Sequence, residues 1–450
     1  MKKLYVIFLL SFLASTVTNA QYQGFYKLNP QEGFFGGGAG MTWIDNKPYV
    51  SVHLFPEFSF ANFGVGLDLN LEFDQEGKIR NENFNEFSDY LSVIRYVRYG
   101  QKNDPLYVRL GALDFASLGH GSIVHLYNNS ISYDTRKVGL SFNVDFHSFG
   151  LEGVYSSFGE KGVVGTRAYV RPLSLTTLGI LPVIGGLELG ASYAMDMNKY
   201  AGVKSGNLNL QTNTFEATED VGAIRIFGFD AELPIVKASF GKIALYFDYA
   251  EIVNYGAGRS LGIEFNLDGL GLVTVRSKLE RRFNGNNYLP SYFDTFYELE
   301  RFKFDETTNS VQSKVQFLDA NTSIGNGYYG ELWISVLNSF DIIGSYQRLD
   351  INPESGVLHL RTDVSPENSS MVVRAGYDKI NIKDEKDLIT LDDRSYVYAE
   401  VGYKPFKYLL MSVIYQWTFS PLRDTNNNII DFIPQKKVEP RISFVYPFDL

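Results

Sequence analysis

The feature of this chain that most limits its fold is a strict alternation of apolar and polar residues over long segments. Between residues 63 and 73, one face would carry Phe63, Val65, Leu67, Leu69, Leu71 and Phe73, and the other Gly64, Gly66, Asp68, Asn70 and Glu72. Since side chains of a β-strand point alternately to its two faces, this pattern predicts a strand that is apolar on one side only. Residues 138–146, 187–195, 243–249 and 261–267 repeat it. The longest segments reach the roughly 9–11 residues with which a tilted strand crosses a bilayer. A soluble β-sandwich also alternates, but its strands average about 5–6 residues, so the lengths favour a membrane barrel.

The first twenty residues differ from the rest of the chain. Two lysines precede an apolar stretch from Leu4 to Val17, and the small residues Thr18 and Ala20 follow at the spacing of a cleavage site. This order is typical of a secretory signal peptide. It predicts cleavage before Gln21. An N-terminal membrane anchor is the alternative, which the short apolar stretch and the absence of stop-transfer charges disfavour.

An exported chain without membrane helices is either soluble or a β-barrel. The longest later apolar stretch, residues 173–189, is interrupted by Pro182 and three glycines. It therefore falls short of the about 18 apolar residues of a membrane helix. The chain has no cysteine, which excludes disulfides, thiolate metal ligands and cysteine nucleophiles. Its 35 phenylalanines, 30 tyrosines and 41 glycines suit alternating strands with aromatic girdles. The net charge of −10 argues against nucleic acid as a partner.

The connections between the predicted strands are of two kinds. Tight ones fall at 61–62, 101–104, 148–150, 233–235, 269–271, 338–339 and 405–407, and long polar ones at 74–89, 197–220, 281–326, 381–393 and 420–435. Outer-membrane barrels place tight turns on the periplasmic side and long loops outside, which here puts both termini on the periplasmic side and makes the strand number even. The fold class predicted is all-β, a transmembrane antiparallel β-barrel of about 18–20 strands, with about 16 left open. The expected organisation is a signal peptide at 1–20, a glycine-rich periplasmic segment at 21–38 leading into the barrel, and the barrel itself at 39–450.

Two long stretches are expected to leave the barrel wall at its outer side. Asp114 to Arg136 lies between an outward and an inward strand, and its glycines and aromatic residues suit a loop that folds into the lumen and narrows it. Residues 281–326 form the second excursion, in which Tyr292 to Phe304 predicts a strand-like core.

The C-terminal segment alternates apolar residues at Ile442, Phe444, Tyr446 and Phe448 to the end of the chain. It resembles the terminal strand of porin-like outer-membrane β-barrels of diderm bacteria, which often closes on an aromatic residue; here Leu450 takes the last position. The resemblance covers the whole mature chain, concerns architecture, and indicates no specific family. It implies an outer-membrane location after export.

Charged residues of both signs fall on the expected lumen side of the strands or in the first excursion. The candidates for lining or constricting the lumen are Arg109, Asp114, His120, His125, Arg136, Arg167, Arg171, Glu188, Glu264, Arg276 and Lys278. Facing rows of acidic and basic side chains can set the selectivity of a pore. Salt bridges that hold a closed barrel are the equally weighted alternative, because a barrel interior is polar in either case.

Other patterns carry weaker chemical signals. His120 and Ser122, with Asn128 nearby, resemble the Ser–His–Asn arrangement of outer-membrane phospholipases, although flanking glycines favour a packing role in a turn. The acidic loop from Asp384 to Asp393 has oxygen ligands for a divalent cation, with a solvated outer loop as the alternative. Residues 36–40, rich in glycine, lack the lysine of a phosphate loop and suit close backbone packing. No cofactor, bound metal or catalytic residue is expected.

The leading hypothesis is a porin-like channel for small solutes, with the loop 114–136 folded inward. The alternative is a non-channel barrel that anchors or assists a surface export or assembly machine, and a lipid hydrolase ranks third. The partners expected are outer-membrane lipid and small solutes; a homo-oligomer and an export-machinery partner stay open.

Overall fold

The computed structural model describes residues 33–450 except 81–89, 91–92, 101–103, 114–115, 131, 133–136, 182, 210, 239, 268–271, 306–307, 320–323, 338–339, 352–353, 365–369, 385, 427 and 449–450. The predicted signal peptide, residues 21–32 of the glycine-rich segment, and the candidates Asp114 and Arg136 therefore lie outside the described residues.

The described part of the chain builds one antiparallel sheet of 22 strands. They are β1 (Gly33–Ile44), β2 (Lys47–Leu54), β3 (Glu57–Phe60), β4 (Phe63–Leu67), β5 (Leu69–Phe73), β6 (Ile94–Tyr99), β7 (Leu106–Gly111), β8 (Gly139–Asp145), β9 (Phe149–Tyr155), β10 (Val163–Val170), β11 (Glu188–Asp196), β14 (Ile224–Ala238), β15 (Gly241–Ile252), β16 (Ala257–Leu267), β17 (Val273–Asn284), β20 (Gly327–Val336), β21 (Phe340–Leu349), β22 (Gly356–Val364), β23 (Met371–Ile382), β24 (Ser395–Phe406), β25 (Leu409–Arg423) and β26 (Ile429–Phe448).

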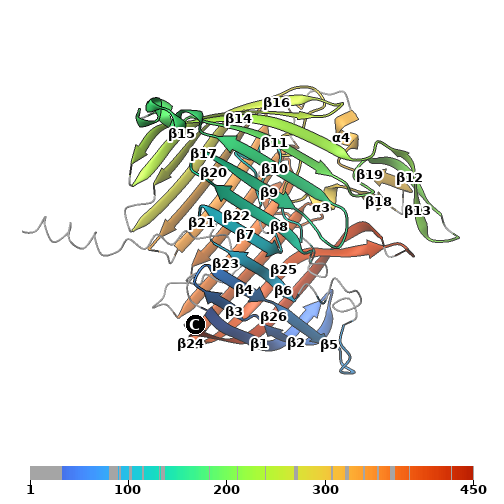
Figure 1. The fold of residues 1–450 in the computed structure, drawn as a ribbon. Coiled ribbons are helices and arrows are strands. Elements are labelled where there is room, and N and C mark those ends of the chain that lie inside the picture. The colour runs from blue at the N-terminus through green and yellow to red at the C-terminus, as the bar shows by residue number, and fades with distance from the viewer. Residues whose placement is uncertain are drawn as a thin grey trace, which may run out of the picture.

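The sheet closes on itself. Strand β26 pairs with β1 from Gly33↔Phe448 to Ile44↔Lys437, so the ladder returns to the strand where it began (Figure 1). Two crossings are each built from two strands, β2 with β3 and β4 with β5, so the 22 described strands make 20 crossings. The all-β fold with 18–20 antiparallel strands is thereby confirmed. The predicted strand 63–73 is one of the divided crossings, interrupted at Asp68.

The tight connections lie together at one end of the barrel. The register places Phe63 beside Tyr99, Asp145 beside Gly150, Val336 beside Phe340 and Phe406 beside Leu409, each at the edge of its ladder. One predicted turn, at 233–235, is wrong, because β14 continues to Ala238 and its partner β15 begins at Gly241. The register shifts between Pro234 and Val236, and such a bulge tolerates a proline that a regular ladder would exclude.

The two faces of the wall differ as the alternation predicts. On β15 and β16, Leu245, Phe247, Leu261, Ile263 and Phe265 point outward and are exposed, whereas the alternate residues Tyr246, Asp248 and Ser260 are buried. Aliphatic and aromatic side chains thus cover the outside, and polar and charged ones the inside. Among the described residues, no helix has the length and apolar character to cross a membrane.

The strand β1 shows why glycines gather at the start of the barrel. It includes residues 33–38, which the sequence predicts in the segment leading into the barrel. A Cβ added at Gly36 would lie 2.2 Å from Cε2 of the buried Phe55, and one added at Gly40 would lie 2.1 Å from the Pro440 carbonyl oxygen. The glycines therefore permit the close packing expected of them. Asp45 and Asn46 link β1 to β2 with φ of 48° and 66°, values that a two-residue hairpin turn requires.

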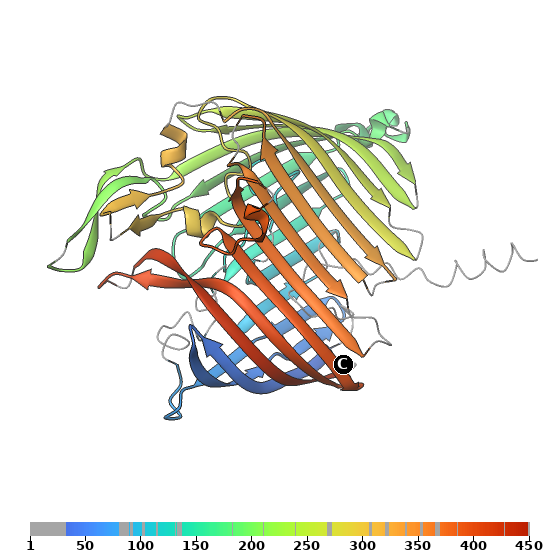
Figure 2. The same cartoon turned by 180° about the vertical axis from the view of Figure 1, so that it is seen from behind.

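Shorter elements lie at the end opposite the tight turns (Figures 1 and 2). They are the hairpins β12 (Val203–Asn209) with β13 (Thr214–Asp220) and β18 (Lys303–Asp305) with β19 (Ser310–Gln312), the helices α3 (Tyr297–Glu300) and α4 (Gln316–Asp319), and the 3-10 turn η5 (Asp387–Ile389). Three further 3-10 turns, η2 (Pro172–Leu175), η3 (Thr177–Ile180) and η4 (Ile184–Gly186), join β10 to β11 at the tight-turn end.

Candidate functional site in the barrel lumen

The first inward segment, residues 112–137, lies against the inner wall wherever it is described. Its Leu118, Ile123 and Val124 are buried in one cluster with wall residues that face the lumen, among them Ala194, Ile226 and Ala250. Asn129 fixes the base of the segment, since its Oδ1 accepts from the Leu113 N–H at 2.9 Å and its Nδ2 donates to the Ser156 carbonyl at 2.8 Å. The apolar half of the segment thus covers the wall from inside, as a constricting loop would.

A second inward segment, residues 285–326, lies on the first. The Ser291 N–H donates to the Ser122 carbonyl at 2.9 Å, the Phe293 N–H to the Ile123 carbonyl at 3.1 Å, and the His125 N–H to the Phe293 carbonyl at 3.0 Å. The predicted strand at 292–304 is wrong: only a parallel bridge between Val124 and Phe293 and the short strand β18 are extended, and α3 follows Phe296. Most residues from 292 to 297 are buried among other lumen residues, and the local sequence pattern does not indicate these contacts.

Together the two segments span the lumen near the end opposite the tight turns. On one side, Tyr297 donates to Asp196 of β11 at 2.7 Å. On the other, Phe296 and Leu299 pack with Ile380 of β23 and Phe419 of β25, and the Ser132 hydroxyl donates to the Phe419 carbonyl at 2.7 Å. Because β11 and β25 are half a ring apart in the order of strands, α3 connects opposite walls of the barrel.

A buried ionic network around Glu298 holds the two segments together. This carboxylate accepts from Tyr127 at 2.5 Å, from Lys137 at 2.6 Å and from both terminal nitrogens of Arg301 at 2.6 and 2.9 Å. Arg301 Nε donates in turn to Asp196 at 2.5 Å. Burial alone would raise the pKa of Glu298, but Arg301 and Lys137 outweigh burial and lower it to about 2. Glu298 is therefore ionised at neutral pH, and its loss would take from Arg301 and Lys137 the buried carboxylate that they share.

A lattice of alternating charges lines the wall below the segments. Arg167 of β10 binds Asp230 at 2.5 Å, Glu188 at 2.7 Å and Glu152 at 3.0 Å. Arg171 shares Glu188 at 2.9 Å and reaches Asp145 at 2.9 Å. The predicted lumen residues Arg167, Arg171 and Glu188 are thus brought into one cluster, with each arginine between carboxylates.

His120 attaches the tip of the first inward segment to this wall. Its ring stacks on Tyr246 with 4.1 Å between centroids, Nδ1 lies 3.2 Å from Asp248, and Nε2 lies 3.4 Å from Glu232. Burial would lower the pKa of His120, but these two hydrogen bonds raise it to about 9. His120 therefore carries a positive charge at neutral pH. Since both ring nitrogens face carboxylates, neither serves as a base for Ser122, and the geometry does not support the hydrolase hypothesis.

Two of the remaining candidates, Lys278 and His125, meet at Tyr329, and the others lie elsewhere on the lumen wall. Lys278 donates to the His120 carbonyl and binds Glu280 at 2.8 Å, whereas His125 contacts Tyr329 at 2.6 Å. Arg276 lies over Trp333, Arg109 over Tyr96, and Glu264 accepts from Asn266 at 2.5 Å. Of the predicted set, Lys278, His125 and His120 contact the inward segments or belong to them, and so does Arg109, whose Nε donates to the Ala112 carbonyl at 3.1 Å. Arg276 and Arg109 also make cation–π contacts.

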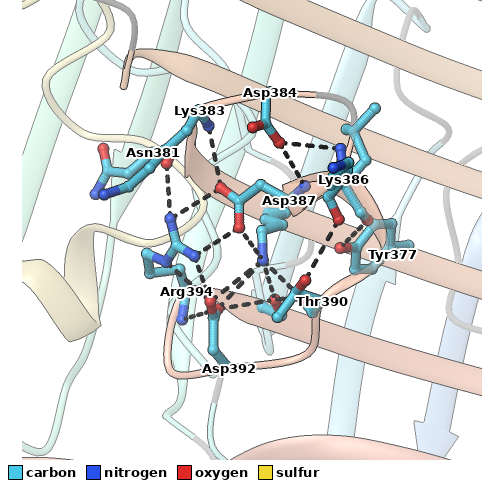
Figure 3. A network of polar contacts seen from close by, with 12 residues as sticks. Tyr377, Asn381, Lys383, Asp384, Lys386, Asp387, Thr390, Asp392 and Arg394 are labelled. Carbon is cyan, nitrogen blue, oxygen red and sulfur yellow. Dashed lines mark hydrogen bonds and ion pairs between the residues drawn. The ribbon is translucent and has the colours of Figure 1, made fainter.

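The acidic outer loop between β23 and β24 is closed by its own cations (Figure 3). Arg394 donates to Asp387 at 2.7 and 3.0 Å, and to the Asn381 carbonyl at 2.8 Å. The buried Lys379 ammonium donates to the Thr390 carbonyl at 2.6 Å and to Asp392 at 3.3 Å. Hydrogen bonds from Arg394 lower the pKa of Asp387 to about 2. Arg394 and Lys379 already bind Asp387 and Asp392, and Asp384 accepts from the Lys386 and Asp387 N–H groups. The loop is therefore better explained as an internally paired turn than as a cation site.

His120 was a predicted candidate, but the ionic network that joins the two inward segments was not predicted. Glu298, Arg301, Tyr127 and Lys137 lie in excursions without periodicity, so their sequence carries no signal for the pairing. Asp230, by contrast, lies on the lumen side of a predicted strand, and the alternation alone could have identified it.

No protein-family model matches the sequence, and neither does any curated protein. Among solved structures, Wzi of Escherichia coli, described as an outer-membrane carbohydrate-binding β-barrel involved in group 1 capsule assembly, has a TM-score of 0.36 at 12% identity, over 93% of this chain and 85% of that one. OccK11 of Pseudomonas aeruginosa has a TM-score of 0.31 at 10% identity, over 93% and 95%. OccD3 of the same species has 0.29 at 10% identity, over 93% and 91%. The resemblance is to outer-membrane β-barrels and concerns the fold alone.

Proposed function

We propose that this protein is an outer-membrane barrel that passes small polar solutes through a lumen narrowed by the two inward segments. The outward apolar face supports the membrane location, because a closed barrel with aliphatic and aromatic side chains outside matches a hydrocarbon surrounding. Exposed aromatic residues also lie at the tight-turn end, namely Phe60, Phe63, Phe146, Phe149, Phe240, Phe406 and Tyr408. Aromatic residues are enriched at membrane interfaces.

The observation that carries the solute pathway is a difference between the two halves of the lumen. Toward the end opposite the tight turns, the inward segments connect opposite walls, and the charged side chains of Glu298 and Arg301 are buried. Toward the tight-turn end, the inward side chains of Arg171, Asp145 and Lys242 keep 26%, 31% and 34% of their surface exposed. Partly exposed charged side chains next to the region that the inward segments span suit the passage of small charged or polar solutes.

Planar-bilayer conductance of the purified barrel tests this proposal. Arg282 and Gly327 are direct partners across β17 and β20, so a short glycine linker can replace residues 286–325 while the strands keep their register. We expect small stepwise conductance from the intact chain and a clearly larger step from the deletion variant. A folded deletion variant that still seals the bilayer would overturn the channel.

A second function, a barrel that serves a surface export or assembly machine, is favoured by a different observation. The hairpins β12–β13 and β18–β19 extend past the barrel (Figure 2). They pack with the beginning of β26 through Val203, Phe304, Val311 and Ile430. This projection offers a docking platform at the outer end. A stoichiometric partner that co-purifies from gently solubilised membranes, and is lost when residues 205–218 are shortened, would favour this function over solute passage.

A further inference from the structure

The connection between β10 and β11 differs from the described turns at its end of the barrel, such as those at 61–62, 146–148 and 407–408. The strands end and begin at Val170 and Glu188, and the intervening residues form η2, η3 and η4 instead of a tight turn. From Pro172 to Leu187 the sequence has no charged residue. Several of its apolar side chains are largely exposed, with Ile180 at 85% and Leu175 at 73%. We call residues 172–187 the apolar connection.

Many polar groups of the apolar connection are hydrogen-bonded to its own backbone. The N–H groups of Ser174, Thr176, Gly179, Leu181, Gly185, Gly186 and Leu187 donate to carbonyls between Arg171 and Ile184. The hydroxyls of Ser174 and Thr176 donate to the carbonyls of Arg171 and Leu173 at 2.6 and 2.9 Å. What remains for the surroundings is mainly hydrocarbon, which is the condition for a segment that lies in lipid.

The position of the apolar connection agrees with a lipid neighbour. Its flanking residues Val170 and Leu189 are partners in the ladder and belong to the exposed outer face of the wall. The turns on either side in the order of strands carry the exposed aromatic residues Phe146 and Phe149, which stack at 4.9 Å, and Phe240. The connection therefore continues a ring of apolar side chains at the tight-turn end.

We propose that the apolar connection is an interfacial segment that lies in the lipid of the leaflet at the tight-turn end of the barrel. This inference rests on the proposed membrane location. The alternative occupants, a periplasmic protein or a second copy of the chain, fit less well, because protein interfaces are enriched in aromatic residues and arginine and have a polar rim. The apolar connection presents leucine, isoleucine and valine without arginine or an aromatic residue.

The absence of cysteine from the chain permits a direct test with single-cysteine variants. Ile180→Cys, Ile389→Cys and Leu261→Cys are each labelled with an environment-sensitive fluorophore on the full-length barrel in phosphatidylcholine vesicles. Ile389 is the matched control, since it is also 85% exposed but lies in the charged outer loop, and Leu261 reports on the outer face of β16. Quenching is compared between lipid carrying a nitroxide near the headgroup and iodide in the aqueous phase.

We expect the nitroxide lipid to quench the label at 180 several-fold more than the label at 389, and iodide to show the reverse order. Equal iodide quenching at 180 and 389, with strong lipid quenching at 261, would overturn the interfacial segment and leave the membrane barrel standing. A label at 180 shielded from both quenchers would overturn it in favour of a second copy or another protein. Absence of lipid quenching at 261 would refute the membrane location itself.

Discussion

Removal of the Glu298 carboxylate should release the second inward segment from the first. Glu298→Ala leaves Lys137 and Arg301 without their shared partner in a site where Glu298 itself is 5% exposed. Breaking a buried ion pair costs about 3–5 kcal/mol. Since each 1.4 kcal/mol is a factor of ten, the population of the undocked segment should rise roughly 100- to 4,000-fold.

Single-channel recording measures this release as added flicker and as openings above the wild-type conductance. The matched control is Glu160→Ala, which removes the other carboxylate on Lys137, at 2.6 Å, from a side chain that is 45% exposed. An ion pair as exposed to water as Lys137–Glu160 contributes about 1 kcal/mol or less, so this variant should behave as wild type. A folded Glu298→Ala barrel whose traces match those of Glu160→Ala would refute the role given to the buried network.

Three further perturbations address the wall and its contacts. Arg167→Met removes the cation that three carboxylates share and should shift the reversal potential in a salt gradient toward cations, whereas Arg167→Lys should shift it less; an unchanged potential would place the cluster off the solute path. The pKa of His120 is raised from 6.5 to about 9, so its stabilising contribution, on the order of 3 kcal/mol, is complete below pH 6.5 and is lost as the pH rises through 9. Proteolysis of the first inward segment should increase over that range in the wild type and stay flat in His120→Gln, where Lys278, Lys242, Asp248 and Glu232 remain; equal profiles would contradict the assignment. Gly262→Ala would place a Cβ 2.1 Å from the Tyr246 ring and should destabilise the barrel by about 1–3 kcal/mol through overpacking, which a lower heat-unfolding midpoint would report. Gly159→Ala is the control, because its added Cβ would meet only the Ser157 hydroxyl at 3.7 Å, and an equal loss there would contradict the overpacking argument.

The wall of the barrel was predictable because its physics is local. Successive side chains of a barrel strand face lipid and lumen in turn, and segments such as 261–267 alternate between apolar and polar residues accordingly. The prediction failed where the conformation depends on the neighbouring strand, as at residues 233–235. Pro234 resembles a turn in sequence but occupies a bulge opposite Ala244 of β15, and this accommodation depends on the partner.

The contents of the lumen were predictable only in part. The position of the first excursion between strands of opposite direction indicated an inward loop, and the structure places its described residues against the wall. The residues that hold it, Glu298 and Arg301, contact Asp196 and Tyr127 across more than a hundred positions of sequence. No periodicity links residues so far apart. The helical turn of α3 is likewise set by burial between opposite walls.

The barrel is closed because its last strand pairs with its first. A designed disulfide between these two strands tests this closure. Ala39 and Ile442 are register partners across β1 and β26, and both are exposed on the outer face. Since the chain has no cysteine of its own, an Ala39→Cys, Ile442→Cys double variant can form only this intramolecular bond. We expect efficient disulfide formation in membranes and a heat-resistant, fast-migrating band on gels. A variant with cysteines at positions 39 and 446, which are not register partners, should form much less of the bond. Equal oxidation of both pairs, or none in either, would contradict the closed barrel.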